Sequence, residues 1–155
     1  MKLLDENLII LDANVETAEE CIRLAGKLFL KAGYVNEEYV DAVVEREKEY
    51  PTGLPGDEIS IAIPHTNNTY VNNPCVGVVI PNKPVEFGIM GTKDDKIPVE
   101  VVFPLVIKDS KMQLVMLREI MKIIQDGELL CKIRDAKDEK EVIGYLERLE
   151  ACMEK

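Results

Sequence analysis

The sequence predicts an α/β fold in which a single domain, spanning residues 1–155, holds a mixed β-sheet flanked by helices. Short apolar runs alternate along the chain with segments whose apolar residues recur at helical spacing, a pattern typical of a sheet covered by helices. Some runs follow each other too closely for a helix to connect them, so both parallel and antiparallel neighbours are expected. A chain of 155 residues can bury about two-thirds of its unfolded surface, which is enough for a sizeable core.

The first third of the chain predicts a strand and two helices. The apolar run 8–11 is expected to form the strand. Residues 17–20, Thr-Ala-Glu-Glu, predict a capping box, because the threonine hydroxyl and the last glutamate can each accept a hydrogen bond from a free backbone amide. Gly33 suits the left-handed position after that helix. A second helix is expected over 37–49, and Pro51 cannot continue it.

The middle of the chain is expected to supply the remaining strands. After a loop rich in proline and glycine, the β-rich runs 59–63, 75–80 and 85–87 each predict a strand. The run 98–107 is the strongest apolar stretch. Pro104 within it has no N–H to donate, so we expect this residue at an edge, at a bulge or at the end of a strand.

The last third of the chain predicts three helices. Ser110 is expected to cap the first, whose methionine-containing apolar stripe should face the core. The residues of that stripe are Met112, Val115, Met116, Ile120, Ile123 and Ile124. Asp126 is expected to cap a short helix over 128–133, and a last helix is expected to begin at Asp138.

The composition argues against several classes of function. The net charge is −10 and no basic patch is evident, so we do not expect binding to nucleic acid, whose backbone is also negative. No apolar stretch reaches the roughly 18 residues of a membrane-spanning helix, so no direct membrane insertion is expected. The first residues include acids and lack the pattern of a signal peptide. We therefore expect a cytoplasmic protein.

The four cysteines predict neither a metal site nor disulfides. They stand at positions 21, 75, 131 and 152 without a CxxC pair, and the chain has only one histidine. Tetrahedral zinc sites need clustered Cys or His ligands, so we expect no structural metal and no other cofactor. In the cytoplasm these thiols should be reduced and pack as small apolar side chains.

His65 is the only histidine, and it directly follows the apolar run 59–63 and Pro64. Near neutral pH an imidazole can serve as a base, a metal ligand or a nitrogen nucleophile. A phosphocarrier needs one uncharged ring with one nitrogen exposed and the other held by a hydrogen bond. A catalytic triad or a metal hydrolase needs further partners. The alternative is a histidine that only satisfies its hydrogen bonds at the end of a strand.

Two other residues could assist a phosphoryl group on His65. Arg46, on the second expected helix, has a planar guanidinium that can donate two hydrogen bonds to phosphoryl oxygens. Its alternative role is that of an exposed helix residue paired with a neighbouring acid. Thr66 offers a hydroxyl directly after His65, and its alternative role is a hydrogen bond within a local turn.

The site residues lie within a recognisable signature. Residues 46–54, Arg-Glu-Lys-Glu-Tyr-Pro-Thr-Gly-Leu, are followed at 59–65 by Ile-Ser-Ile-Ala-Ile-Pro-His. Together they resemble the phosphorylation-site signature of enzyme IIA domains of the bacterial sugar phosphotransferase system, in the mannitol/fructose-type branch. The Glu-Tyr-Pro-Thr-Gly stretch is most similar to galactitol-specific members. The resemblance spans nearly the whole chain and implies the mannitol/fructose-type enzyme IIA architecture.

This resemblance implies a phosphotransferase that relays a phosphoryl group. His65 would accept the group from the histidine-containing phosphocarrier protein and pass it to enzyme IIB, which serves the membrane component enzyme IIC in galactitol-like sugar uptake. Arg46 matches the family arginine that holds the phosphoryl charge. Mannitol-type members carry a second active-site histidine where this chain has Gln113. The amide of Gln113 can donate a neutral hydrogen bond but adds no positive charge.

Two other functions are compatible with the residues. The first is a regulatory enzyme IIA-like protein of the nitrogen-related type, whose phosphorylation state would control binding to a target. The second is a binding module or hydrolase with His65 as general base, although the sequence has no nucleophile elbow of the G-x-S-x-G type. Transfer of the phosphoryl group to enzyme IIB would distinguish the phosphocarrier from both.

Overall fold

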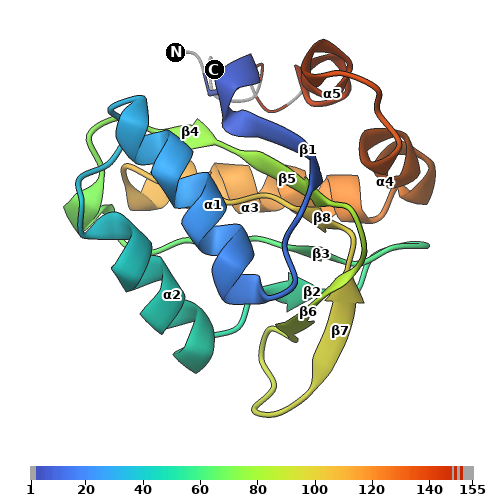
Figure 1. Ribbon diagram of the computed structural model, residues 1–155, viewed down its shortest axis with the longest axis horizontal. Coiled ribbons are helices and arrows are strands. Elements are labelled where there is room, and N and C mark those ends of the chain that lie inside the picture. Colours follow the sequence, from blue (N-terminus) through green and yellow to red (C-terminus); the bar gives the residue numbers. More distant parts are fainter. Residues whose placement is uncertain (1–2, 148, 150, 152–155) are drawn as a thin grey trace.

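A computed structural model describes residues 3–147, 149 and 151 of the chain, and it contains a mixed five-stranded sheet (Figure 1). The strands lie in the order β1-β5-β8-β3-β2. Two pairs, β1 with β5 and β3 with β8, are parallel, whereas β5 with β8 and β2 with β3 are antiparallel. The bounds are β1 (Ile9–Ala13), β2 (Gly53–Leu54), β3 (Ile61–Ala62), β5 (Val78–Pro81) and β8 (Val101–Val102). The predicted mixed sheet is confirmed.

Helices cover both faces of this sheet (Figure 1). One face packs against α1 and α2, and the other against α3, α4 and α5. The bounds are α1 (Ala18–Lys31), α2 (Tyr39–Glu49), α3 (Ser110–Ile124), α4 (Gly127–Arg134) and α5 (Glu139–Tyr145), with short 3-10 helices η1 (Glu6–Leu8) and η2 (Asn68–Tyr70). No helix in the described part of the chain is both long and apolar enough to cross a membrane.

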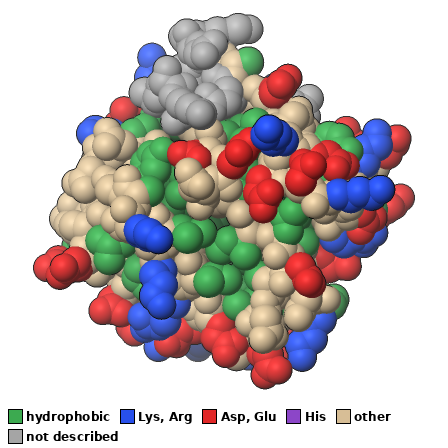
Figure 2. Space-filling view, turned by 45° about the horizontal axis from the view of Figure 1, so that its top comes forward, with side chains coloured by type: hydrophobic (Ala, Val, Ile, Leu, Met, Phe, Trp, Pro, Cys, Tyr) green, Lys and Arg blue, Asp and Glu red, His purple; other side chains and the backbone are tan. Residues whose placement is uncertain are grey.

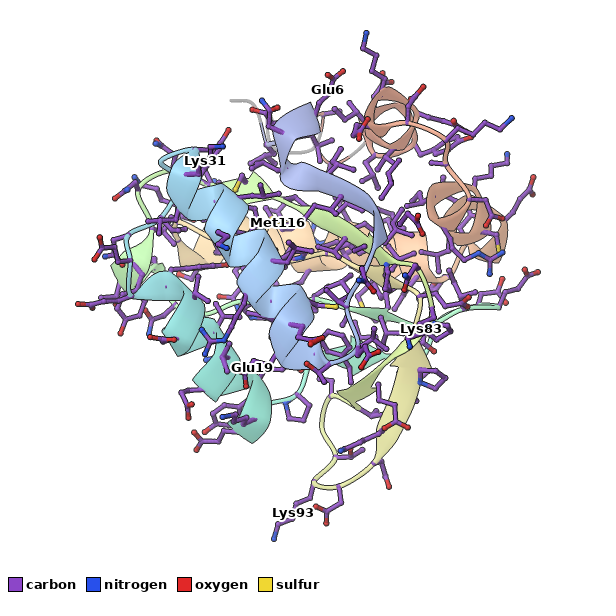
Figure 3. All side chains as sticks on the ribbon, in the orientation of Figure 1. Glu6, Glu19, Lys31, Lys83, Lys93 and Met116 are labelled. Carbon is purple, nitrogen blue, oxygen red and sulfur yellow. The ribbon has the colours of Figure 1, made fainter. Side chains whose placement is uncertain are left out.

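The side chains of β3 alternate between the two cores, as expected for a strand buried on both faces. Ile61 and Ile63 contribute to the core under α3, and Ala62 contributes to the core under α1 and α2. Met116 of α3 is fully buried and lies near the centre of the molecule in Figure 3, whereas Lys93 lies at the tip of an outer loop. The predicted apolar stripe of α3 is therefore inside, although Val115 is only partly buried.

Two predicted strands are each divided in the structure. The run 75–80 forms β4 (Cys75–Val76) and β5, and the run 98–107 is shared among β7 (Lys96–Val99), β8 and β9 (Leu105–Val106). Gly77 separates β4 from β5, and a Cβ at this position would lie 2.7 Å from the Phe29 ring. Pro104 lies between β8 and β9, as predicted, and its carbonyl accepts a hydrogen bond from the Gly77 amide at 2.9 Å. β7 pairs with β6 (Val85–Gly88) in a hairpin that extends from the sheet (Figure 1).

The described cysteines carry free thiols. Cys21 and Cys75 are fully buried in the core under α1 and α2, which confirms their packing as small apolar residues. Burial raises the pKa of the Cys21 thiol to about 12 and also raises the pKa of Cys75, so both thiols stay protonated at neutral pH. Cys131 is partly exposed and donates a hydrogen bond to Glu58 at 3.3 Å. Cys152 lies outside the described residues.

Most predicted helix caps are confirmed. Thr17 accepts a hydrogen bond from the Glu20 amide at 3.1 Å, while the Glu20 carboxylate accepts one from the Glu16 amide, one residue before the expected partner. Asp126 caps α4, and Asp138 caps α5. Gly33 has the expected positive φ of 85° after α1.

The predicted cap of α3 is wrong. Asp109 is the N-cap, and its carboxylate accepts a hydrogen bond from the Met112 amide at 2.8 Å. Its extended backbone, with φ −149° and ψ 168°, is typical of an N-cap, whereas Ser110 is already the first helical residue. The Asp109 charge also interacts favourably with the positive end of the helix dipole.

This assignment predicts different stabilities for two neighbouring variants. Asp109→Ala should lower the free energy of unfolding by about 1 kcal/mol, because it removes the cap. Ser110→Ala serves as the matched control and should change it by only a few tenths of a kcal/mol, since alanine is a good helix former. Urea unfolding followed by circular dichroism measures both. Equal losses in the two variants would contradict Asp109 as the cap.

Candidate functional site

His65 lies just beyond the end of β3, in a backbone segment held from both sides. The carbonyls of Ala62 and Pro64 accept hydrogen bonds from the amides of Phe103 and Leu105, at 2.8 and 2.9 Å. On the opposite side, the Ile63 amide donates to the Thr52 carbonyl at 3.3 Å. The His65 side chain is only 7% exposed. The segment before it is thus fixed by backbone hydrogen bonds to residues distant in the sequence.

The imidazole of His65 is held by one nitrogen. Its Nδ1 lies 2.7 Å from the carbonyl oxygen of Ile63. A carbonyl can only accept a hydrogen bond, so Nδ1 carries the hydrogen and Nε2 keeps its lone pair. The alternative of a merely satisfied histidine accounts for Nδ1, but among the described residues Nε2 has no hydrogen-bond partner.

The surroundings of His65 favour the uncharged ring. Burial lowers the pKa of the imidazole below its usual range, and the positive charge of Arg46 lowers it further. The hydrogen bond to Ile63 raises the pKa and opposes these effects in part. Because burial has the largest influence, the ring is neutral at neutral pH. A neutral ring with a free Nε2 lone pair is the form that a nitrogen nucleophile requires.

Arg46 lies in the last turn of α2, close enough for its charge to act on His65. Its guanidinium carbon is 5.4 Å from the centre of the Tyr50 ring, so the two groups are in cation–π contact. Its Nε is buried and has no hydrogen-bond acceptor among the described residues. The alternative role of Arg46 is to pair with a neighbouring acid. In the described part of the chain Arg46 forms no salt bridge, so this pairing is not observed. The guanidinium therefore retains a donor for another acceptor.

Glu47 and Thr52 form a contact to which the sequence analysis assigned no role. One carboxylate oxygen of Glu47 accepts a hydrogen bond from the Thr52 amide at 2.8 Å, and the other accepts one from the Thr52 hydroxyl at 2.7 Å. Burial raises the pKa of Glu47 to about 7, against the opposing effects of these bonds and of the Arg46 charge. The only sequence signal for this contact is the presence of both residues in the stretch 46–54.

Thr66 is buried next to His65, with 7% of its surface exposed. The local turn after it is formed instead by Asn67, whose side chain accepts a hydrogen bond from the Thr69 amide at 3.0 Å. Asn68 donates from its side chain to the Lys108 carbonyl at 2.7 Å, which ties the segment after His65 to the start of α3. A role for the Thr66 hydroxyl at the phosphoryl group stays a prediction.

Gln113 lies in the first turn of α3 and is partly exposed. Because β3 and β8 are parallel, the chain leaves both strands at the same edge of the sheet. His65 follows β3 at this edge, and α3 begins a few residues after β9. The hydrogen bond from the Asn68 side chain to the Lys108 carbonyl joins the segment after His65 to the start of α3. The fold thus places Gln113 at the same edge as His65, and its contact with a phosphoryl group stays a prediction.

The titratable side chains of the site do not resemble a metal centre. Among residues 3–147, 149 and 151, no group of three His, Cys, Asp or Glu side chains is placed to hold a metal ion. The chemistry available to the site is instead that of one neutral nucleophilic nitrogen beside one guanidinium.

Comparisons with known sequences point to one family. The family described as "Phosphoenolpyruvate-dependent sugar phosphotransferase system, EIIA 2" matches residues 2–149. The mannitol-specific phosphotransferase enzyme IIA component of Bacillus subtilis (strain 168) is 30% identical over 147 residues, which cover 93% of this chain and 96% of that protein. The galactitol-specific EIIA component of Escherichia coli (strain K12) is 26% identical over 111 residues, which cover 72% and 73%. Relatives of both sugar types match, so the galactitol preference stays a prediction.

Some similar proteins are much longer. The mannitol-specific EIICBA component of Vibrio cholerae is 32% identical over 145 residues, which cover 93% of this chain. The chain spans only 21% of the length of that protein. The similarity therefore concerns one part of that longer protein.

Solved structures show the same architecture. The structure of enzyme IIAMTL in complex with phosphorylated enzyme IIBMTL from Escherichia coli has a TM-score of 0.76 and 28% identity, and covers 95% of this chain and 99% of that chain. The nitrogen regulatory protein IIA-Ntr from Neisseria meningitidis has a TM-score of 0.75 and 21% identity, covers 93% of this chain and 96% of that one, and shows the shared fold. The predicted architecture is confirmed.

The single histidine allows a direct test of the site electrostatics. In the folded protein the His65 ring should titrate below its ordinary pKa of 6.5, because burial disfavours the charged form. The neutral ring therefore contributes to the free energy of unfolding above pH 6.5, the pKa in the unfolded chain. This contribution is lost as the pH falls through the lower pKa of the folded protein. NMR of protein labelled with 15N-histidine measures the titration without overlap, and the urea-unfolded chain is the control. A midpoint at or above the unfolded value would contradict the proposed burial of a neutral ring.

Proposed function

The chain belongs to the EIIA 2 family of the phosphoenolpyruvate-dependent sugar phosphotransferase system, and from this premise we propose that His65 carries a phosphoryl group between two partner proteins. Residues 1–155 form one enzyme IIA domain in this proposal. The donor is the histidine-containing phosphocarrier protein, and the acceptor is an enzyme IIB component that serves membrane enzyme IIC. The solved complex of a similar enzyme IIA with phosphorylated enzyme IIB supports the choice of acceptor.

The hydrogen bond from Nδ1 of His65 to the Ile63 carbonyl, at 2.7 Å, is the observation that carries this proposal. It leaves Nε2 as the nucleophile. The Nε2 lone pair attacks the phosphorus of a phosphohistidine on the donor, the donor P–N bond breaks, and its electron pair returns to the donor ring. His65 then holds both the Nδ1 hydrogen and the phosphoryl group, and the Ile63 carbonyl stabilises the positive ring. Transfer to enzyme IIB reverses these steps with a new acceptor.

Arg46 is the cation of the site in this proposal. Phosphoryl transfer places charge on three equatorial oxygens and depends mainly on positioning and electrostatic stabilisation. The guanidinium of Arg46 acts on His65 through its charge, and its buried Nε lacks an acceptor. A phosphoryl oxygen would supply one. Gln113 and Thr66 add neutral hydrogen bonds from the amide and the hydroxyl.

The surface charge is suited to partner proteins with basic docking surfaces. The chain has 29 Asp and Glu residues against 19 Lys and Arg residues. Figure 2 shows acidic side chains spread over one face of the molecule among scattered basic ones. Opposite charge on a partner speeds encounter and helps to orient the two surfaces.

The proposed substrate of the whole transport system is a hexitol of the galactitol type. The Glu-Tyr-Pro-Thr-Gly stretch favours this choice, and the galactitol-specific relative supports it. The similarity to mannitol-specific relatives makes mannitol the competing hexitol. Uptake assays with matching enzyme IIB and IIC components would decide between them.

Phosphorylation of His65 is the first expected outcome. Phosphorylated carrier protein should label the chain once, and His65→Ala should abolish the label, because the chain has no second histidine. The label should be lost in acid and retained in alkali, as expected for a phosphoimidazole. Phosphate analysis by intact mass spectrometry measures this. A folded wild-type chain that takes no label from the carrier would refute the proposal.

Onward transfer separates transport from regulation. A labelled chain that passes its phosphoryl group to enzyme IIB acts as a transport component. Good labelling without transfer to any enzyme IIB would favour the regulatory role, in which the phosphorylation state controls binding to a target.

Arg46 should matter for the rate of labelling. Arg46→Gln should slow phosphorylation of His65 by about 10- to 100-fold, because charged hydrogen bonds of this kind contribute about 1.5–3 kcal/mol. It should also raise the pKa of His65, since the Arg46 charge lowers it. Lys48→Gln is the matched control, because Lys48 is an exposed cation on the same helix. Equal rates in the two variants would exclude Arg46 as the cation of the site.

A further inference from the structure

The carbonyl that holds His65 belongs to a residue at the end of the sheet ladder. Within a strand, the N–H and C=O of one residue point to the same side, and successive residues point to opposite sides. Ala62 and Pro64 face β8 and β9, where the amides of Phe103 and Leu105 bind their carbonyls. The backbone N–H and C=O of Ile63 point to the opposite side, just beyond Gly53 and Ala62, the last paired residues of β2 and β3. The Ile63 carbonyl has the His65 ring as partner there.

Thr52 holds Ile63 on that side. The Thr52 carbonyl accepts a hydrogen bond from the Ile63 amide at 3.3 Å. Thr52 itself is 3% exposed, and both of its donors go to one side chain, the carboxylate of Glu47. An unbroken series of hydrogen bonds thus runs from Glu47 through Thr52 and Ile63 to Nδ1 of His65.

We propose that Glu47 is a positioning residue for His65, which sets the orientation and the tautomer of the imidazole through Thr52 and the backbone of Ile63. The proposal rests on the proposed function of His65 as a phosphocarrier and names a further residue for that reaction. Glu47 does not touch the reacting atoms. It acts by fixing where the Ile63 carbonyl points, and that carbonyl decides which ring nitrogen bears the hydrogen.

The location of Glu47 supports this role. It lies in the last turn of α2, where a carboxylate interacts unfavourably with the negative end of the helix dipole. It is also partly buried, and this burial disfavours its charged form. Helix stability therefore gives no reason for an acid here, whereas the two hydrogen bonds to Thr52 do. The neighbouring Glu49, by contrast, is exposed on the same helix.

The consequence for the reaction is geometric. A nucleophilic nitrogen must lie in line with the breaking bond, and small displacements of reacting atoms are costly. If Thr52 moves, the Ile63 carbonyl can turn and the imidazole can rotate or exchange its tautomer. Nε2 would then carry the hydrogen in part of the molecules, and those molecules could not attack phosphorus.

Four variants test this role. Glu47→Ala removes both hydrogen bonds to Thr52. Glu47→Gln keeps them, because its amide oxygen can accept from the Thr52 amide and its NH2 can donate to the Thr52 hydroxyl. Thr52→Val removes only the hydroxyl bond, and Glu49→Ala is the exposed control on the same helix. Far-UV circular dichroism verifies that each protein is folded.

Two measurements are made on each variant. Long-range 1H–15N NMR of protein labelled with 15N-histidine reports the tautomer of the single imidazole without any partner protein. The rate of labelling by phosphorylated carrier protein reports the reaction. Glu47→Ala should reduce the Nδ1–H tautomer and slow labelling by roughly 10- to 100-fold. Glu47→Gln and Glu49→Ala should behave as wild type, and Thr52→Val should lie between.

The outcomes separate this proposal from the proposed function. A folded Glu47→Ala protein with the wild-type ring spectrum and rate would overturn the positioning role, and so would a Glu47→Gln protein as impaired as Glu47→Ala. If Glu47→Ala does not fold, Thr52→Val decides, and an unchanged ring spectrum in that variant rejects the role. If wild type takes no label, the phosphocarrier function fails, and the ring spectra alone still show whether Glu47 sets the tautomer.

Discussion

The hydrogen bond between Nδ1 of His65 and the Ile63 carbonyl is the contact on which the site depends. It exists because β3 is flanked by β8 on one side and by β2 on the other, and β2 ends before Ile63 is paired. The carbonyl left at that point needs a donor, since buried backbone groups are rarely without partners. The same bond places the hydrogen on Nδ1 and leaves the lone pair on Nε2. One hydrogen bond therefore both satisfies the Ile63 carbonyl, just beyond β3, and orients the imidazole of His65.

In the last turn of α2 the adjacent side chains of Arg46 and Glu47 make different contacts. Arg46 stacks on Tyr50 and keeps a buried Nε without an acceptor in the described structure. Glu47 is directed to Thr52 instead of to its neighbour. If the two paired with each other, the guanidinium would be less available to an anion. The unsatisfied donor costs stability in the free protein, and such costs are typical of sites that bind a charged group.

Much of the fold could be predicted because its elements depend on local patterns. The apolar stripe of α3, the caps of α1, α4 and α5, and the turn at Gly33 follow from residues close in sequence. The strands were less predictable. The run 75–80 is apolar throughout, and only the structure shows that it is divided at Gly77, where a Cβ would lie 2.7 Å from the Phe29 ring. At α3 the sequence pattern predicted Ser110 as the cap, and the extended backbone of Asp109 shows that the preceding residue has this role.

The sequence by itself determined which residues could do the chemistry. It contains one histidine, an arginine within a recognisable signature, and no cluster suited to a metal, so His65 and Arg46 could be chosen without coordinates. Only the tertiary structure decided the contacts and the protonation state of these side chains. The tautomer of His65, its lowered pKa and the link to Glu47 all arise from contacts among α2, β2 and β3. Hydrogen bonds and burial between segments distant in sequence depend on the packed sheet, and no local pattern encodes them.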